Sequence, residues 1–222
     1  KMKLVKYIQE KQQSVLKIRG IPVFLKCEKE KHDMYREGIS LALSKVPKKF
    51  ILNIKGITVS DSQYLRQRKL NALFNKGSIF LLNEHKDAED VIDDVVHEIA
   101  HSVEEKYQKE IYSDLKIEEE FLNKRKSLWM RLGQLGHEKE LNHFLKTKYD
   151  REFDAFLYKN VGYPLLRSIT KDIFYSPYAA TSLREYFANS FEAFFMKEKI
   201  QRLRRISPAA YQKNVMLLNM EE

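Results

Sequence analysis

The sequence predicts a mixed α+β protein that is mostly helical and carries a small mixed sheet. The 222 residues include only 7 Gly and 5 Pro, too few for a turn-dense sandwich or barrel. Long segments repeat apolar residues at helical spacing, whereas short runs of β-branched and aromatic residues predict strands. With 43% hydrophobic residues the chain can bury a core, and its length suits one domain with a substantial insertion.

The N-terminal part is expected to supply the sheet. Residues 3–18 are charged and mixed, which is compatible with a helix, and residues 32–46 carry apolar positions at helical spacing. Strands are predicted in three runs that β-branched and aromatic residues dominate: 20–28, 49–59 with a turn at Gly56, and 77–84.

Two strong helices are predicted further along the chain. The first covers 88–108, where acidic residues crowd the first turn and a wide apolar stripe follows. The second covers 176–203, opens after Pro177 and is lined with aromatic residues. We therefore predict a single domain, 1–222, with an N-terminal part at 1–109, a charged helical insertion at 110–165 and a C-terminal helical part at 166–222.

The formal net charge is +9, but the basic residues alternate with 31 acids, as in "KIEEEFLNKRK" and "HEKELNHFLKTK". This pattern is typical of solvated helix faces, and no RNA-recognition signature, Cys/His finger or basic tail accompanies it, so charge alone does not predict a nucleic-acid partner. The single cysteine excludes an internal disulfide and a Cys-rich zinc site. The sequence leaves the oligomeric state open.

No apolar stretch approaches membrane-spanning length, and the first residues lack the apolar core of a signal peptide. We expect a soluble chain without a membrane span. Because it opens on Lys1, secretion as a trimmed product and a cytoplasmic location both stay open.

The stretch "DDVVHEIAHSVEEKY" (93–107) places His97 and His101 four residues apart with Glu98 between them. On a helix this spacing puts both imidazoles on one face, where they can bind one Zn²⁺ at about 2.0–2.1 Å. Zinc acidifies its bound water, and a carboxylate outside the coordination shell can take the proton and deliver it to a leaving amine. The alternative is two exposed histidines, which the apolar neighbours on this face oppose.

Two imidazoles do not complete a zinc site, so a third ligand must lie elsewhere. No third histidine follows at the extended metalloprotease spacing. His137 and His143 are six apart in a charged stretch, which does not align them on a helix. A carboxylate on the later aromatic helix is the better candidate, and Glu185 and Glu192 both qualify.

"HEIAH" followed by "YAATSLREYFANSFEAFF" resembles the catalytic domain of the anthrax lethal factor-like metallopeptidases, which include the Pro-Pro endopeptidases. In that family a Tyr lies seven residues before a Glu that opens an aromatic helix, and Tyr178 and Glu185 match this spacing. The resemblance implies a zincin-like fold, one zinc ion held by His97, His101 and Glu185, Glu98 as general base and acid, and Tyr178 as donor to the oxyanion. The match covers about 30 residues.

The chain departs from the family pattern at three places. Ala100 stands where the family usually has Gly. Asn189 stands where a second acidic residue often supports a zinc-bound His; Asn can accept an imidazole N–H, but without charge. The stretch between His101 and Glu185 is longer than in the family, which is why residues 110–165 are taken as an insertion and why substrate preference is left open.

Each assignment has an alternative. Ser182 to Glu185 fits a capping box, in which the Glu bonds back to the helix start, and Tyr178 fits a packed aromatic. The strand at 78–83, with Ser78, Ile79, Phe80 and Leu81, is expected either to be a sheet edge that binds an extended peptide or to be a core strand.

The sequence therefore predicts a zinc endopeptidase acting on a protein or peptide. Two alternatives remain: a DNA-associated metallopeptidase, and a non-catalytic toxin or phage module in which zinc is only a brace.

Overall fold

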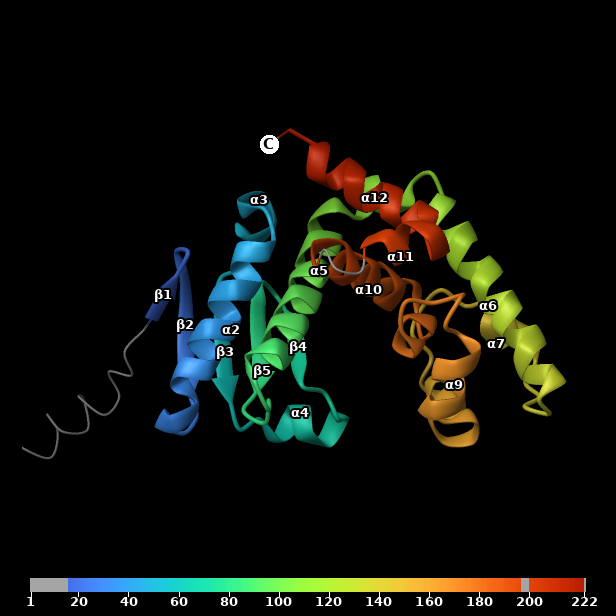
Figure 1. The fold of residues 1–222 in the computed structure, drawn as a ribbon, viewed down its shortest axis with the longest axis horizontal. Helices are drawn as coiled ribbons and strands as arrows, with labels where there is room; N and C mark the ends of the chain where they lie inside the picture. The colour runs from blue at the N-terminus through green and yellow to red at the C-terminus, as the bar shows by residue number, and fades with distance from the viewer. Residues whose placement is uncertain (1–15, 197–199, 222) are drawn as a thin grey trace, which may run out of the picture. The chain divides into compact units, whose positions relative to one another are not determined.

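The computed structural model describes residues 16–196 and 200–221. It is 64% helical and contains a five-stranded mixed sheet, which confirms the predicted mixed α+β class (Figure 1). The chain divides into two compact units, residues 1–102 and 103–222.

The sheet belongs to the first unit. Its strands follow the order β1-β2-β3-β5-β4. The central pairs β2–β3 and β3–β5 are parallel, whereas β1 pairs with β2 and β4 pairs with β5 in antiparallel fashion. The strands are β1 (Leu16–Ile18), β2 (Ile21–Lys26), β3 (Gly56–Ser60), β4 (Ala72–Asn75) and β5 (Ser78–Leu82).

The predicted strands at 20–28 and 77–84 are confirmed as β2 and β5. The prediction for 49–59 is wrong in its first half, because the chain forms helix α3 (Lys48–Ile51) and the strand starts only at Gly56. Pro47 precedes this helix, a position at which its fixed φ is tolerated. Of the helix predicted over 3–18, residues 3–15 lie outside the described part, and residues 16–18 form β1 instead.

Four further helical segments start in the first unit: η1 (Lys29–Lys31), α2 (His32–Lys45), α4 (Gln63–Arg68) and α5 (Ala88–Tyr112). Helices α2 and α5 pack closely where Gly38 faces the first turn of α5. A Cβ added at Gly38 would lie 2.7 Å from Cβ of Val91, so this contact requires glycine. The core between sheet and helices consists of fully buried aliphatic side chains, among them Val23, Ile39, Leu43, Ile57, Val59, Ile79, Leu81, Val95 and Ile99.

Helix α5 carries the histidine pair, and its start is set locally. The Asp87 carboxylate accepts the backbone N–H of Asp90 at 2.9 Å, which satisfies one of the unpaired donors of the first turn. Glu89 and Asp90 add negative charge at the positive end of the helix dipole. The predicted helix at 88–108 is confirmed and runs on to Tyr112, with non-helical dihedral angles at Tyr107.

The second unit contains the end of α5 and a set of helices. The long prediction over 176–203 is confirmed only in part: the chain forms a short 3₁₀ turn, then α10, and resumes at α11 after residues 197–199, which lie outside the described part. The elements are α6 (Lys116–Gln134), α7 (Leu141–Phe144), α8 (Arg151–Ala155), the π-helix η2 (Phe156–Val161), α9 (Tyr163–Ile169), the 3₁₀ turn η3 (Pro177–Ala180), α10 (Leu183–Phe195), α11 (Ile200–Ile206) and α12 (Pro208–Asn219).

Residues 110–165, predicted as an insertion, share one packed unit with the C-terminal helices. The Phe121 ring of α6 lies 5.5 Å from the Tyr186 ring of α10. The Glu120 carboxylate accepts the Tyr186 hydroxyl at 2.7 Å and the backbone N–H groups of Ala209 and Ala210 at the start of α12. Helix α6 is therefore a core element of the second unit.

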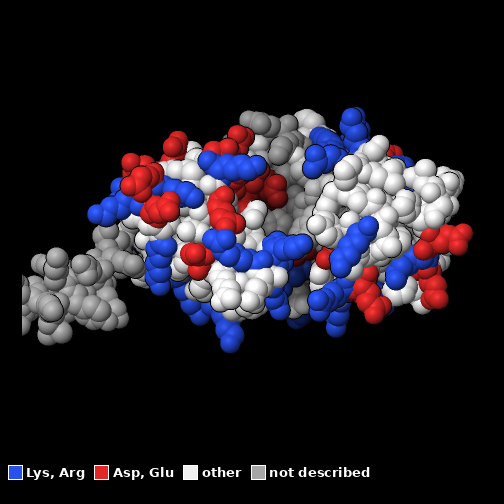
Figure 2. Space-filling view, turned by 90° about the horizontal axis from the view of Figure 1, so that it is seen from below, with Lys and Arg blue, Asp and Glu red and all other residues white. Residues whose placement is uncertain are grey.

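Charged side chains of both signs share the surface. On the face drawn in Figure 2, Asp and Glu side chains lie among the Lys and Arg side chains. This agrees with the alternation of charges in the sequence. Among the described helices, none combines the length and apolar character needed to cross a membrane.

Candidate metal centre

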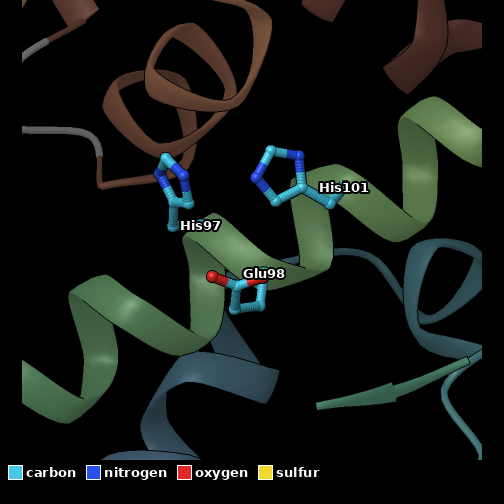
Figure 3. Close-up of side chains that lie close together, drawn as sticks. All are labelled: His97, Glu98 and His101. Carbon is cyan, nitrogen blue, oxygen red and sulfur yellow. The ribbon is translucent and has the colours of Figure 1, made fainter. Parts of the chain in front are cut away.

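His97 and His101 project from the same side of α5 (Figure 3). Their ring centroids are 5.0 Å apart, and the ring planes stand at 85° to each other. His101 is buried, with 6% of its surface exposed, and His97 is partly exposed. The predicted pairing of the two imidazoles on one helical face is confirmed.

A carboxylate oxygen of Glu98 lies within 4.8 Å of a ring nitrogen of each histidine, and Glu98 is itself buried. Its carboxylate oxygen Oε2 accepts the backbone N–H of Phe74 on β4 at 2.5 Å. A hydrogen bond from a backbone donor to a carboxylate fixes the orientation of the side chain. Glu98 is thus anchored to the sheet rather than left on the helix surface.

The strand next to Glu98 is β4, and it forms one edge of the sheet. Leu82 donates its N–H to Asn71, so in the antiparallel ladder the pairs Leu73–Phe80 and Asn75–Ser78 are the hydrogen-bonded ones. The alternate residues, Ala72 and Phe74, therefore turn their backbone groups away from β5, although both residues are buried. The bond from Phe74 to Glu98 agrees with this alternation.

The expectation that residues 78–83 form a sheet edge is wrong. Strand β5, with Ser78, Ile79, Phe80 and Leu81, pairs with β3 on one side and with β4 on the other. Its backbone groups are used inside the sheet, and Ile79 and Leu81 are fully buried. The core-strand alternative describes β5 correctly.

Strand β4 was not among the predicted strands, although the sequence carries a signal for it. Lys76 and Gly77 both have positive φ, 49° and 85°, as in a two-residue type I′ hairpin turn. The runs "ALFN" and "SIFLL" flank this turn. Interpreting the two runs as a hairpin would have predicted β4 as a strand paired with β5.

The other predicted site residues lie in the second unit. Tyr178 is in η3, and Glu185 is in the first turn of α10, with Asn189 one turn further on. The Ser182 hydroxyl accepts the N–H of Glu185 at 3.2 Å, so this half of the capping box is formed. That bond engages the backbone of Glu185 rather than its carboxylate.

Asn189 is buried and holds two local partners. Its side-chain N–H donates to the carbonyl oxygen of Glu185 at 3.0 Å, and its side-chain oxygen accepts the Ser176 hydroxyl at 2.5 Å. Asn189 therefore ties the first turn of α10 to the residue that precedes η3.

Tyr178 and Glu185 influence each other electrostatically. Burial raises the pKa of the Tyr178 phenol, and the negative charge of Glu185 raises this pKa further. The phenol consequently keeps its proton at neutral pH and can act as a neutral hydrogen-bond donor. This proximity agrees with the seven-residue spacing on which the predicted pairing of Tyr178 and Glu185 rests.

Two further histidines have partners away from this pair. His85 is buried and forms a 2.8 Å bond with Asp94, and His32 lies 3.1 Å from the carbonyl oxygen of Cys27. Among the described residues, the one group of His, Cys, Asp or Glu side chains with potential ligand atoms all within 4.8 Å of one another is His97, Glu98 and His101.

The donor set suits zinc. Two imidazoles on one helical turn are ordinary zinc ligands, and a Glu that is anchored to the backbone suits a base outside the coordination shell. A catalytic zinc site uses three protein ligands, of which this pair could provide two.

Comparison of the chain with protein-family models, with curated proteins and with solved structures gave no match.

Proposed function

We propose that the protein is a zinc-dependent endopeptidase with a zincin-like catalytic domain. The observation that carries this proposal is the position of Glu98: its carboxylate lies beside two imidazoles spaced for one metal ion and is held by the N–H of an edge strand. A site that only braces a fold has no use for a base in this position. The resemblance to the lethal factor-like metallopeptidases adds to this support.

His97, His101 and Glu185 would hold one zinc ion. Support for Glu185 comes from an ion pair within the second unit, in which Nε of Arg184 lies 3.4 Å from a carboxylate oxygen of Glu104. Glu104 follows His101 by three residues on α5, which is about one helical turn. Arg184, the residue before Glu185, is therefore paired with Glu104, which lies one turn beyond His101.

Zinc at this site would supply Lewis acidity toward water and toward the peptide carbonyl. Glu98 takes the proton from the attacking water and delivers it to the leaving amine. Tyr178 donates its phenolic hydrogen to the oxygen that becomes negative as the carbonyl is attacked. Asn189 holds the start of α10, and with it the backbone of Glu185, in place.

The substrate would bind in extended form along β4 rather than β5. Edge strands recognise peptides through their outward-facing backbone groups. Here these are the groups of Ala72 and the carbonyl of Phe74, because the N–H of Phe74 already donates to Glu98. A peptide added to this edge would run next to Glu98, because Phe74 donates to that carboxylate. The substrate class is therefore a protein segment or peptide that can adopt an extended conformation.

Metal analysis and cleavage profiling test the proposal together. The purified chain should contain one zinc ion per molecule and should cleave members of a peptide library, with loss of cleavage on chelation and recovery on zinc addition. Glu185→Gln should weaken zinc binding, whereas Glu192→Gln, two turns further along α10, should not. If Glu192→Gln weakens zinc binding and Glu185→Gln does not, Glu192 is the ligand.

The same measurements distinguish the alternatives. Zinc binding without cleavage of any peptide would indicate a non-catalytic, zinc-braced module. Steeply salt-dependent binding of DNA, together with cleavage, would favour a DNA-associated metallopeptidase. A chain that binds no zinc would refute the proposal.

A further inference from the structure

Helix α6 contains an arginine with an unusual environment. Arg125 is 1% exposed, and its guanidinium donates to four backbone carbonyl oxygens. Nη2 lies 2.6 Å from the oxygen of His143 and Nε lies 3.2 Å from that of Phe144. Nη1 lies 2.5 Å from the oxygen of Ala180 and 3.4 Å from that of Thr181.

Aromatic rings complete this environment. The guanidinium carbon lies 3.8 Å from the centroid of the Phe153 ring. No ion pair joins Arg125 to a carboxylate of the described residues. Burial lowers the pKa of Arg125 to about 9, which still leaves it charged at neutral pH, and the Asp150 charge opposes this shift. Carbonyl dipoles and ring faces therefore take the place of a counter-ion.

The carbonyls that Arg125 binds belong to two separate segments. His143 and Phe144 form the end of α7, whereas Ala180 and Thr181 lie between Tyr178 and Glu185. A direct hydrogen bond also joins the stretch that follows α7 to this segment, since the N–H of Leu183 donates to the carbonyl oxygen of Thr147 at 2.8 Å. The Thr181 hydroxyl also donates to the carbonyl oxygen of Tyr178 at 2.8 Å.

Part of the segment from Tyr178 to Glu185 lies outside regular α-helix. It contains one short 3₁₀ turn, which is a weak element, and the non-helical N-cap Ser182. The planar guanidinium of Arg125 holds the carbonyl groups of Ala180 and Thr181 at defined distances from α6. A lysine cannot reproduce that arrangement, because its donors all sit on one nitrogen, whereas those of the guanidinium are spread over three nitrogens in a rigid plane.

We propose that Arg125 is a positioning residue that sets the segment carrying Tyr178 and Glu185, and through it the oxyanion donor and the third zinc ligand. This inference rests on the proposed function for the roles of those two residues. A displacement of about 1 Å at a catalytic group can reduce the rate about 100-fold. Supporting residues around a metal ligand commonly change metal affinity by about 10- to 100-fold.

Arg125→Lys tests the proposal against a matched control, Lys124→Met. Lys124 is the neighbouring residue of α6, is also buried and also donates to two backbone carbonyls, those of Ile173 and Ile206, outside the segment in question. The measurements are zinc affinity by chelator competition, kcat and KM on a cleaved peptide, urea unfolding, and amide hydrogen exchange over 178–186.

Arg125→Lys should lower kcat about 100-fold, weaken zinc binding about 10-fold or more, leave KM nearly unchanged and speed exchange over 178–186. Lys124→Met should lose stability but keep kcat and zinc affinity. The proposal would be overturned if Arg125→Lys kept wild-type kcat, zinc affinity and amide exchange, or if both variants lost kcat and zinc affinity equally. If Arg125→Lys does not fold, Phe153→Leu, which removes the ring beneath the guanidinium, should give the same pattern in weaker form.

The exchange measurement separates this inference from the proposed function. If the wild type binds no zinc and cleaves nothing, the proposed function fails in the first measurement. Amide exchange over 178–186 then still reports on the hydrogen bonds between Arg125 and this segment. Unchanged exchange in Arg125→Lys would show that Arg125 does not position the segment.

Discussion

The backbone N–H of Phe74 donates to a carboxylate oxygen of Glu98 at 2.5 Å, so the edge strand and the histidine helix are joined at the candidate base. A single bond thereby fixes the direction of the carboxylate and marks the strand along which a peptide would lie. Two of the predictions below follow from this relationship.

Glu98→Gln should sharply reduce turnover and leave the metal in place. The Gln side-chain oxygen can still accept the Phe74 N–H, so the local structure should persist, but an amide cannot take a proton from water. We expect kcat to fall by about 10²–10⁴. Peptide cleavage and zinc content measured on the same preparation check this. Glu105→Gln, on an exposed position of the same helix, is the control.

Tyr178→Phe should lower kcat about 100- to 1000-fold, the usual cost of losing one oxyanion donor. Zinc content and KM should change little, because the phenol is expected to act on the oxygen only as charge develops. Tyr163→Phe removes another tyrosine hydroxyl of the second unit and serves as comparison. Equal losses in both variants would assign Tyr178 a packing role.

Ala72→Pro should weaken substrate binding without affecting zinc. Proline is tolerated on an edge strand, and it removes the outward N–H that a bound peptide would use. The loss of one backbone hydrogen bond, worth about 0.5–1.5 kcal/mol, predicts a roughly 2- to 10-fold higher KM. Steady-state kinetics on a cleaved peptide measure this. An unchanged KM in a folded variant would place the substrate elsewhere.

His85 and Asp94 predict how stability depends on pH. Nε2 of His85 lies 2.8 Å from the Asp94 carboxylate, and Nδ1 lies 2.8 Å from the carbonyl oxygen of Leu82. Burial alone lowers the pKa of His85, but the hydrogen bond to Asp94 and the charge of Asp94 outweigh it, and the net pKa is raised. Both ring nitrogens face acceptors, as an imidazolium requires.

Because the folded-state pKa is raised, the stabilisation is complete below about pH 6.5, the ordinary imidazole value, and disappears as the pH rises through the folded-state pKa. Urea unfolding of the metal-free protein should therefore show this contribution at low pH and its loss at higher pH. In Asp94→Asn, the unfolding free energy at low pH should fall by about 1–3 kcal/mol, and this part of the pH dependence should vanish. A parallel pH profile in both proteins would refute the assignment.

Interleaved charges in "KIEEEFLNKRK" led to the prediction of solvated helix faces, and for Lys124 and Arg125 this was wrong. Both are buried, since long cationic side chains can bring their donors to backbone carbonyls inside a helical unit. Composition and alternation do not reveal such carbonyls, because they belong to residues 18 to 82 positions away.

The sequence by itself determined the histidine helix, the placing of His97 and His101 on one face and the acidic first turn, because helical periodicity and capping depend on residues close along the chain. It also determined the α+β class. Only the tertiary structure decided that β4 rather than β5 is the edge, that Phe74 holds Glu98, and that Arg125 binds the segment before α10. Strand order and carbonyl partners arise from long-range pairing, which no local pattern records.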